Sequence, residues 1–390
     1  MKPPSLRMEQ SAPSFFSGLA VKIENLRQAG HDVIRLDEGS PDLPPAPAII
    51  ATLIKSASSG KTHSYQTHRG PKDLRAAWAG MYQRVHNVTL DPDKEVLPLL
   101  GTKEGIFHLS LAYLDPGDVA LIPDPGYITY SRGAVFAGST PYFMPLLPEN
   151  DYLPDFDAIP SDVLGRTKLL WLNYPSNPTA AVASLQFFEK AVAFARKNDL
   201  LLCHDAAYAQ VTYSGYHAAS ILEVPGAKEV AVEFNSLSKT YNMAGWRLGA
   251  LVGNPQVVRT LFTLKTNADS SHFLPILQAA TEAMTGDQDW IKERNQVYQQ
   301  RRDLVIQALH GLGLMAAVPQ ASLYVWCPVP TGWTCEDFTD LVLDQAHVSL
   351  TPGTVFGNRG QGYVRISLTA PGERLKLAMQ QIASLSFAKK

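Results

Sequence analysis

Short apolar runs alternate with amphipathic segments of helix length from about residue 90 onward. The apolar runs have the length of strands, and they lie at residues 95–100, 118–123, 168–173, 200–205, 229–235 and 248–253. Between them lie segments such as 103–114 and 184–199, which have the length and composition of amphipathic helices. Alternation of this kind predicts βαβ units and a mostly parallel sheet, and therefore an α/β fold.

Three of these predicted strands end in polar residues, at Asn173, Asp205 and Asn235. In open α/β sheets, ligands bind outside the carboxyl ends of the strands. The chemistry of this chain is therefore expected at that edge of the sheet.

The C-terminal part of the chain follows a different pattern. A long charged amphipathic segment at 287–313 predicts a helix that leads into a second, smaller α+β domain. Strand-like segments at 321–329 and 362–368 and a terminal helix near 372–385 follow it. We therefore expect an N-terminal arm that is part of the small domain, a large domain and a small C-terminal domain, at residues 1–44, 45–285 and 286–390.

Charge and cysteine content exclude several classes of function. The net charge is -2, from 34 basic and 36 acidic residues, and no run of Lys or Arg stands out, so a nucleic-acid or membrane partner is not expected. No apolar run approaches the roughly 18 residues that a membrane span needs. Cys203, Cys327 and Cys335 show no CxxC spacing, which predicts reduced thiols, no metal site and a cytoplasmic location.

One lysine stands in an unusual setting, in the segment NSLSKTYNMAGWRLG at 235–249. Lys239 follows a predicted strand end, where its amine could form an imine with an aldehyde cofactor. Ser236, Ser238 and Arg247 lie close to it in sequence and could bind a phosphate. The alternative is an ordinary surface lysine.

Asp205 ends the apolar segment LLLCHD, so its carboxylate would be partly desolvated and would need a cationic partner. A protonated ring nitrogen would serve, and the alternative is a helix N-cap. Asn177 in NYPSNPTA, and Tyr208, three residues after Asp205, could reach a phenolic oxygen of the same ring. Asn177 could instead be a simple turn residue, and Tyr208 a core or surface residue.

Three further segments add candidate ligands. Gly101 and Thr102 lie between a predicted strand and a helix, where backbone amides and a hydroxyl can bind an anion, although an ordinary turn is the alternative. Tyr127 in PDPGY could lie against a flat cofactor or be one more buried aromatic residue. Arg365 lies in the strand-like segment GYVRISL, where a buried guanidinium requires an anion: a substrate carboxylate or a structural ion pair.

Taken together and in this order, these motifs resemble the fold-type I, class I/II aminotransferases that depend on pyridoxal 5'-phosphate (PLP). The resemblance covers nearly the whole chain, through GSPDLPP, HSYQTHRG, GTKEG, PDPGY, NYPSNPT, HDAAY, NSLSKTYNMAGWRLG and GYVRISL. The runs VLPLLGTKEGI, NSLSKTYNMAGWR and PDLPPAP are most similar to the LL-diaminopimelate aminotransferase-like branch.

The resemblance implies a role for each candidate residue. Lys239 would hold PLP, Asp205 would pair with its ring nitrogen, and Tyr127 would stack on the ring. The phenolic oxygen would be bound by Asn177 and Tyr208, and the phosphate by Gly101, Thr102, Lys103, Ser236, Ser238 and Arg247. Tyr65 would reach the phosphate in a neighbouring subunit, which implies a homodimer, and the substrate would contact Gly39, Asn177, Arg365 and Phe15.

Two positions depart from the pattern of this family. Ala180 replaces the glycine of the usual NPTG run, which we expect to change the local backbone modestly without loss of activity. Phe15 stands where the diaminopimelate branch tends to have a tyrosine.

The resemblance implies a ping-pong exchange of an amino group between an L-amino acid and a 2-oxo acid, with 2-oxoglutarate and glutamate as one pair. Aminotransfer from aromatic, branched or antibiotic-precursor amino acids is an alternative, as is C–S bond cleavage by a β-lyase of the same fold. A PLP-binding transcription regulator is disfavoured, because no helix-turn-helix extension is present and the chain is nearly neutral.

Overall fold

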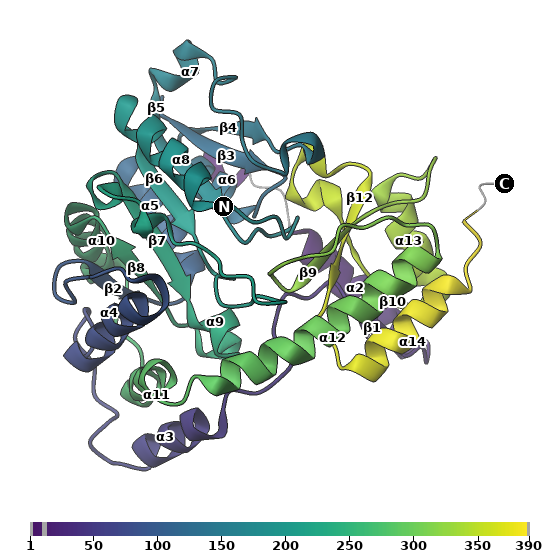
Figure 1. The fold of residues 1–390 in the computed structure, drawn as a ribbon, viewed down its shortest axis with the longest axis horizontal. Helices are drawn as coiled ribbons and strands as arrows, with labels where there is room; N and C mark the ends of the chain where they lie inside the picture. The colour runs from purple at the N-terminus through teal and green to yellow at the C-terminus, as the bar shows by residue number, and fades with distance from the viewer. Residues whose placement is uncertain (1–2, 10–13, 388–390) are drawn as a thin grey trace.

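The computed structural model describes residues 3–9 and 14–387. Its largest element is a seven-stranded sheet with the strand order β2-β8-β7-β6-β5-β3-β4. The strands are β2 (Val96–Leu99), β3 (Val119–Asp124), β4 (Thr140–Pro145), β5 (Thr167–Asn173), β6 (Leu201–Asp205), β7 (Ala231–Ser236) and β8 (Gly249–Gly253). All neighbours pair in parallel except β8, which runs antiparallel to both β7 and β2. The predicted mostly parallel sheet is confirmed (Figure 1).

Helices cover both faces of this sheet, which explains why its strands are apolar runs without alternation. One face packs against α5 (Thr102–Tyr113), α6 (Thr129–Phe136) and α10 (Pro255–Ala268). The other face packs against α4 (Lys72–His86), α8 (Leu185–Lys197) and α11 (Leu274–Thr285), and α3 (Pro47–Ala57) packs on α11. Two one-turn helices, α7 (Ser161–Leu164) and α9 (Leu237–Thr240), lie in the connections.

A second, smaller group of elements forms its own core beside the large sheet (Figure 1). Its antiparallel sheet has the order β11-β12-β9, formed by β9 (Tyr324–Pro328), β11 (Thr351–Pro352) and β12 (Tyr363–Ser367). The long helix α12 (Asp289–Gly311) runs into it from the large sheet, and α13 (Cys335–Ala346) and α14 (Gly372–Ala383) cover it. The α/β fold with a smaller α+β part is as the sequence predicts, whereas the domain boundaries at 44/45 and 285/286 stay a prediction.

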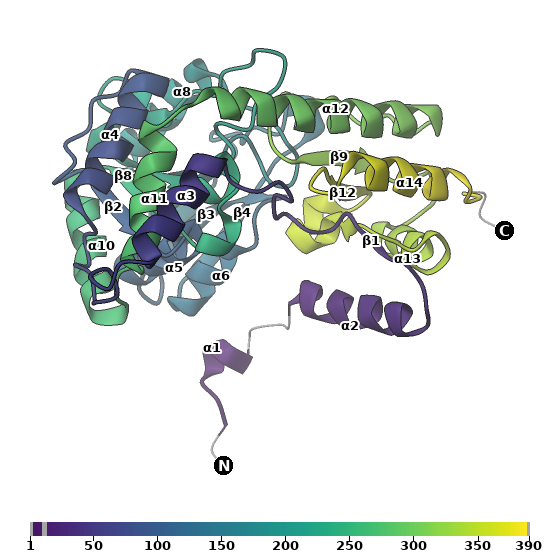
Figure 2. The same cartoon turned by 90° about the horizontal axis from the view of Figure 1, so that it is seen from below.

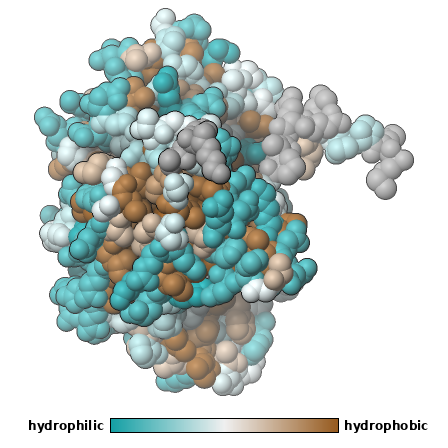
Figure 3. Space-filling view, turned by 90° about the vertical axis from the view of Figure 1, so that its right-hand side faces the viewer, coloured by the Kyte–Doolittle hydropathy of each residue, from teal (hydrophilic) through white to brown (hydrophobic). Residues whose placement is uncertain are grey.

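The N-terminal arm joins the smaller group. Strand β1 (Ile34–Arg35) pairs in parallel with β10 (Val348–Ser349), and α2 (Phe15–Gln28) lies along α13, while α1 (Leu6–Glu9) lies apart from them, beside α6 (Figure 2). Seen from the end that carries α13 and α14, the surface is hydrophilic with hydrophobic areas between, as is ordinary for a folded protein (Figure 3). No helix in the described ranges is long and apolar enough to cross a membrane. The three cysteines are buried and unpaired in the structure.

Candidate active site

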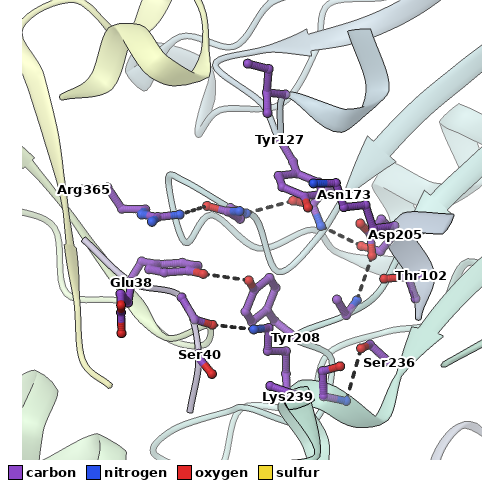
Figure 4. Close-up of a pocket in the computed structure, with 18 of the residues that line it drawn as sticks. Glu38, Ser40, Thr102, Tyr127, Asn173, Asp205, Tyr208, Ser236, Lys239 and Arg365 are labelled. Atoms are coloured by element: carbon purple, nitrogen blue, oxygen red, sulfur yellow. Dashed lines mark hydrogen bonds between the residues drawn. The ribbon is translucent and has the colours of Figure 1, made fainter. Parts of the chain in front are cut away.

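A cavity of about 760 Å³ opens at the carboxyl ends of the central strands, between the large sheet and the smaller group of elements. The predicted residues that line it are Gly39, Thr102, Lys103, Tyr127, Asn177, Asp205, Tyr208, Ser236, Ser238, Lys239, Arg247 and Arg365. Figure 4 shows Lys239, Asp205, Tyr208 and Arg365 entering this space from different elements. Residues that lie more than 300 positions apart in the sequence therefore share one site.

Lys239 lies in the single turn of α9, directly after β7. Ser236 caps this turn, since its side chain accepts a hydrogen bond from the Ser238 amide at 3.3 Å. The Lys239 ammonium donates to the backbone oxygen of Gly39, which belongs to the N-terminal arm. Burial lowers the pKa of Lys239 to about 8, and the positive charges of Arg365 and Arg247 act in the same direction. A larger fraction of this amine is therefore unprotonated near neutral pH than for an exposed lysine.

Asp205 is a buried carboxylate at the end of β6. It accepts hydrogen bonds from the Tyr130 hydroxyl at 2.8 Å and from the Ala207 amide at 3.2 Å. Burial raises its pKa, and no basic side chain among the described residues forms an ion pair with it. A carboxylate held in this way has neutral donors but no counter-charge, so the pocket suits a cationic ligand atom.

The Arg365 guanidinium enters the cavity from β12. It donates to Asn177 Oδ1 at 2.8 Å and to the backbone oxygen of Asp37 at 2.6 Å, and it lies over the ring of Tyr324 at 4.2 Å. Its Nε atom is buried without a hydrogen-bond partner, and no described carboxylate forms an ion pair with it. A buried cation with spare donors is a site for an anion.

The opposite part of the cavity lies at the start of α5. Gly101 has a φ of +83°, and a Cβ at this position would lie 2.5 Å from Arg247 Nη2. Glycine is therefore favoured by the backbone conformation, and a larger residue here would push the Arg247 guanidinium aside. Thr102 at the helix N-terminus, Ser236, Ser238 and Arg247 line the same cavity, so hydroxyls, a cation and free backbone amides converge there.

Three predicted residues, Gly101, Tyr65 and Phe15, are not among those that line the cavity. Tyr65 is 93% exposed in the single chain, on the connection between α3 and α4. Phe15 is also placed differently from the prediction: it lines a separate groove between α2 and α13, whereas its neighbour Phe16 lines the active-site cavity. The reason is helical geometry, because Phe15 begins α2 and consecutive residues on a helix face different directions.

Two residues in the site, Tyr324 and Asn173, were given no role there from the sequence. Tyr324 on β9 lies 2.9 Å from the Tyr208 hydroxyl, and its own hydroxyl occupies the space where a Cβ on Gly39 would lie. Asn173 donates to the Asp205 backbone oxygen at 2.7 Å, and its position at a strand end was a usable signal. For Tyr324, a tyrosine in the apolar segment 321–329, the sequence offered no comparable signal.

The family model for aminotransferase class I and II matches residues 31–382. The chain belongs to this family. It is 47% identical over 376 residues to an LL-diaminopimelate aminotransferase from Moorella thermoacetica, with 96% of each chain covered. A relative of the same name from Dehalococcoides mccartyi is 46% identical over 380 residues, covering 97% of this chain and 98% of the relative.

Solved structures agree with this assignment. The substrate-bound BacF structure from Bacillus subtilis superimposes with a TM-score of 0.95 at 36% identity, covering 98% of this chain and 97% of that one. The protein is thus a PLP-dependent aminotransferase of fold type I. The cavity fits that cofactor, since it offers a buried carboxylate without a counter-charge, a partly buried lysine whose pKa is lowered, and a group of hydroxyls beside an arginine.

Ala180 takes the place of the family's glycine and keeps a glycine-like backbone. Its φ is +58°, inside a turn in which its amide donates to Ser176 O at 3.1 Å. A residue with a Cβ costs about 1–2 kcal/mol in this backbone region, a cost that glycine avoids. Glycine in turn loses about 0.5–1 kcal/mol because its unfolded chain has more conformational entropy. We expect Ala180→Gly to raise the free energy of unfolding by about 0.5 kcal/mol, seen as a higher Tm. Ala181→Gly, where φ is not positive, should lower it instead.

Proposed function

We propose that this aminotransferase takes LL-diaminopimelate as its amino donor and 2-oxoglutarate as its acceptor. The observation that carries the proposal is the identity of 43–47% to aminotransferases named for LL-diaminopimelate, over nearly the full length of both chains. The site also contains a group that suits every amino donor. Arg365 offers a buried cation for the α-carboxylate that all amino donors share.

In this proposal each residue of the cavity has a defined task. Lys239 would hold the cofactor, and its amine would serve as the base that takes the proton from the substrate Cα. Asp205 keeps the cofactor's ring nitrogen protonated, and Asn177 and Tyr208 bind its phenolic oxygen. The phosphate is bound by Gly101, Thr102, Lys103, Ser236, Ser238 and Arg247, and Tyr127 packs on the ring. When bound, PLP supplies an electron sink for the Cα–H bond.

The remaining tasks concern the substrate. Arg365 and Asn177 orient the α-carboxylate, with the backbone of Gly39 beside them, and Phe16 takes the place predicted for Phe15 at the edge of the cavity. Lys239 acts as the base because burial lowers the pKa of its amine to about 8. One site serves both half-reactions, so amino acid and 2-oxo acid occupy it in turn.

A screen of amino donors against 2-oxoglutarate tests the proposed substrate. LL-diaminopimelate should give a kcat/KM at least about tenfold above aromatic, branched and small donors, a margin of roughly 1.4 kcal/mol. A preference for another donor would refute the substrate but leave aminotransfer intact. Release of pyruvate from cystathionine without any 2-oxo acid would instead indicate the β-lyase activity.

Arg365→Ala should lower kcat/KM about a hundredfold for every amino donor, because a charge-assisted pair to the shared carboxylate contributes roughly 3 kcal/mol. Arg365→Lys should recover little, since lysine lacks the planar fork that matches a carboxylate at two points. PLP binding should be unchanged in both variants. Steady-state kinetics with several donors measure this, and a loss confined to one donor would show that Arg365 reads the side chain.

We also propose a homodimer in which Tyr65 of one subunit reaches the phosphate in the other, as the exposure of this tyrosine in the single chain allows. Tyr65→Phe should then weaken PLP retention several-fold without changing the fold. Spectrophotometric titration of apoenzyme with PLP measures the effect, and light scattering measures the mass. An active monomer, or Tyr65→Phe with unchanged retention, would contradict the shared site.

A further inference from the structure

A second charged group lies one residue before Asp205, on the opposite face of the sheet. His204 and Asp205 are the last two residues of β6, so their side chains point to opposite faces. The His204 side chain is fully buried, with its ring 4.7 Å from that of Phe188. It does not line the cavity, and neither does its partner Glu233, the residue opposite it on β7.

The hydrogen bonds of the His204 ring define its protonation. Nε2 lies 3.0 Å from the backbone oxygen of Tyr174, which can only accept, so Nε2 carries a proton. Nδ1 lies 2.8 Å from Glu233 Oε2. The Glu233 oxygens already accept from Tyr82 at 2.7 Å and from Ser220 at 2.9 Å, as expected for an ionised carboxylate. Nδ1 therefore carries a proton as well, and the pair is an imidazolium with a carboxylate.

Charge and burial agree with this assignment. Burial acts to raise the pKa of Glu233, but the hydrogen bond and charge of His204 outweigh it and leave that pKa below its usual value. Both groups are fully buried, and breaking such a pair leaves an uncompensated charge in the core. Two hydrophobic residues would fill the same space without burying charge, so the presence of an ion pair at this position needs an explanation.

We propose that the His204–Glu233 pair is a positioning device that holds Asp205 in place and in its ionised form. His204 is the covalent neighbour of Asp205 and binds the backbone oxygen of Tyr174, while Asn173, the residue before Tyr174 at the end of β5, donates to the Asp205 backbone oxygen. The strand end that carries Asp205 is thus fixed from both faces of the sheet. Of the two charges, that of His204 is the nearer to Asp205, because His204 is its neighbour on β6 whereas Glu233 lies on the next strand, β7.

The charge of His204 acts against the burial of Asp205. Burial raises the pKa of Asp205, the donors Tyr130 and Ala207 and the charge of His204 lower it, and the charge of Glu233 raises it. The proposal rests on the proposed role of Asp205 as partner of the cofactor's ring nitrogen. Neither His204 nor Glu233 reaches the substrate, so both act only through Asp205.

The protonation is tested first, in the apoenzyme and without any activity measurement. Nitrogen NMR of protein labelled with ¹⁵N-histidine at pH 8 should show one ring with both nitrogens protonated, and this signal should disappear in His204→Gln. Only neutral rings in the wild-type spectrum would overturn the proposal.

The function is tested with His204→Gln and Glu233→Gln, compared with Tyr82→Phe, which removes one hydrogen bond to Glu233 but keeps both charges. Both charge variants should weaken PLP binding about tenfold and lower kcat with little change in KM, because Glu233→Gln also deprives the buried His204 ring of the carboxylate that keeps it charged. Tyr82→Phe should lower the Tm and leave both quantities unchanged. Charge variants that bind PLP and turn over like Tyr82→Phe would overturn the proposal.

Asp205→Asn, measured in parallel, distinguishes a failure of the positioning role of the pair from a failure of the role proposed for Asp205. If it loses PLP affinity and kcat while His204→Gln keeps them, the pair is structural only and this inference fails alone. If Asp205→Asn keeps both, the role proposed for Asp205 fails, and the positioning inference fails with it.

Discussion

Lys239→Ala should abolish transamination, with a loss of at least about 10⁴-fold in kcat, because the cavity loses the amine whose pKa is lowered to about 8. Lys239→Arg should restore nothing, since arginine keeps the charge but cannot give up its proton. The reaction is followed as glutamate formed from 2-oxoglutarate. In the wild-type protein, borohydride reduction should attach the cofactor permanently to the peptide that contains Lys239.

The matched control for this variant is Lys228→Ala. Lys228 also forms hydrogen bonds to the protein, to Glu95 and to the Thr89 backbone, but it lies outside the cavity. Its loss should change stability slightly and activity not at all. Reduction that attaches the cofactor to any lysine other than Lys239 would refute the assignment.

Asp205→Asn should lower kcat by roughly 10²–10³-fold, the effect of removing a fixed charge that acts on the reacting group. Asparagine can accept from the Ala207 amide through Oδ1 and donate to the Tyr130 hydroxyl through Nδ2, so the fold should survive while the charge is lost. Steady-state kinetics and PLP titration measure the effect.

Asp124→Asn is the comparison for that variant. Asp124 is likewise a buried aspartate at the end of a parallel strand, but it accepts a hydrogen bond from the Arg359 amide and does not line the cavity. Its kcat should stay within a few-fold of wild type. A loss of tenfold or less for Asp205→Asn, about 1.4 kcal/mol, would mean that Asp205 acts only as a structural cap.

The architecture could be predicted from the sequence because it depends on local patterns. Apolar runs with polar last residues predicted both the parallel sheet and its ligand-binding edge, and Asp205 and Asn173 do meet there. The antiparallel direction of β8 has no such signal, because a buried strand has the same composition in either direction.

The rest of the site depends on contacts between distant segments. The short-range pattern around Tyr324 gives no sign that its hydroxyl meets Tyr208 and the backbone of Gly39. The choice between Phe15 and Phe16 needed the exact start of α2, and helix ends are the least certain part of any sequence-based assignment. A one-residue error there turns a side chain from the cavity to another groove.

Because β1 pairs with β10, this part of the fold can form only after nearly the whole chain has been synthesised. Ile34 leaves the ribosome early, whereas its partner Val348 is made near the end of synthesis. The wall of the cavity that contains Arg365 is likewise made long after Lys239. At the usual elongation rate of about 5–20 residues per second, the arm spends roughly 15–60 s without its partner strand. The nascent large sheet, with the residues assigned to the cofactor, can form in that interval, but the substrate-carboxylate site around Arg365 cannot. Substrate binding is therefore the last property of this site to be completed, and chains that stop before β12 should lack the carboxylate site proposed around Arg365.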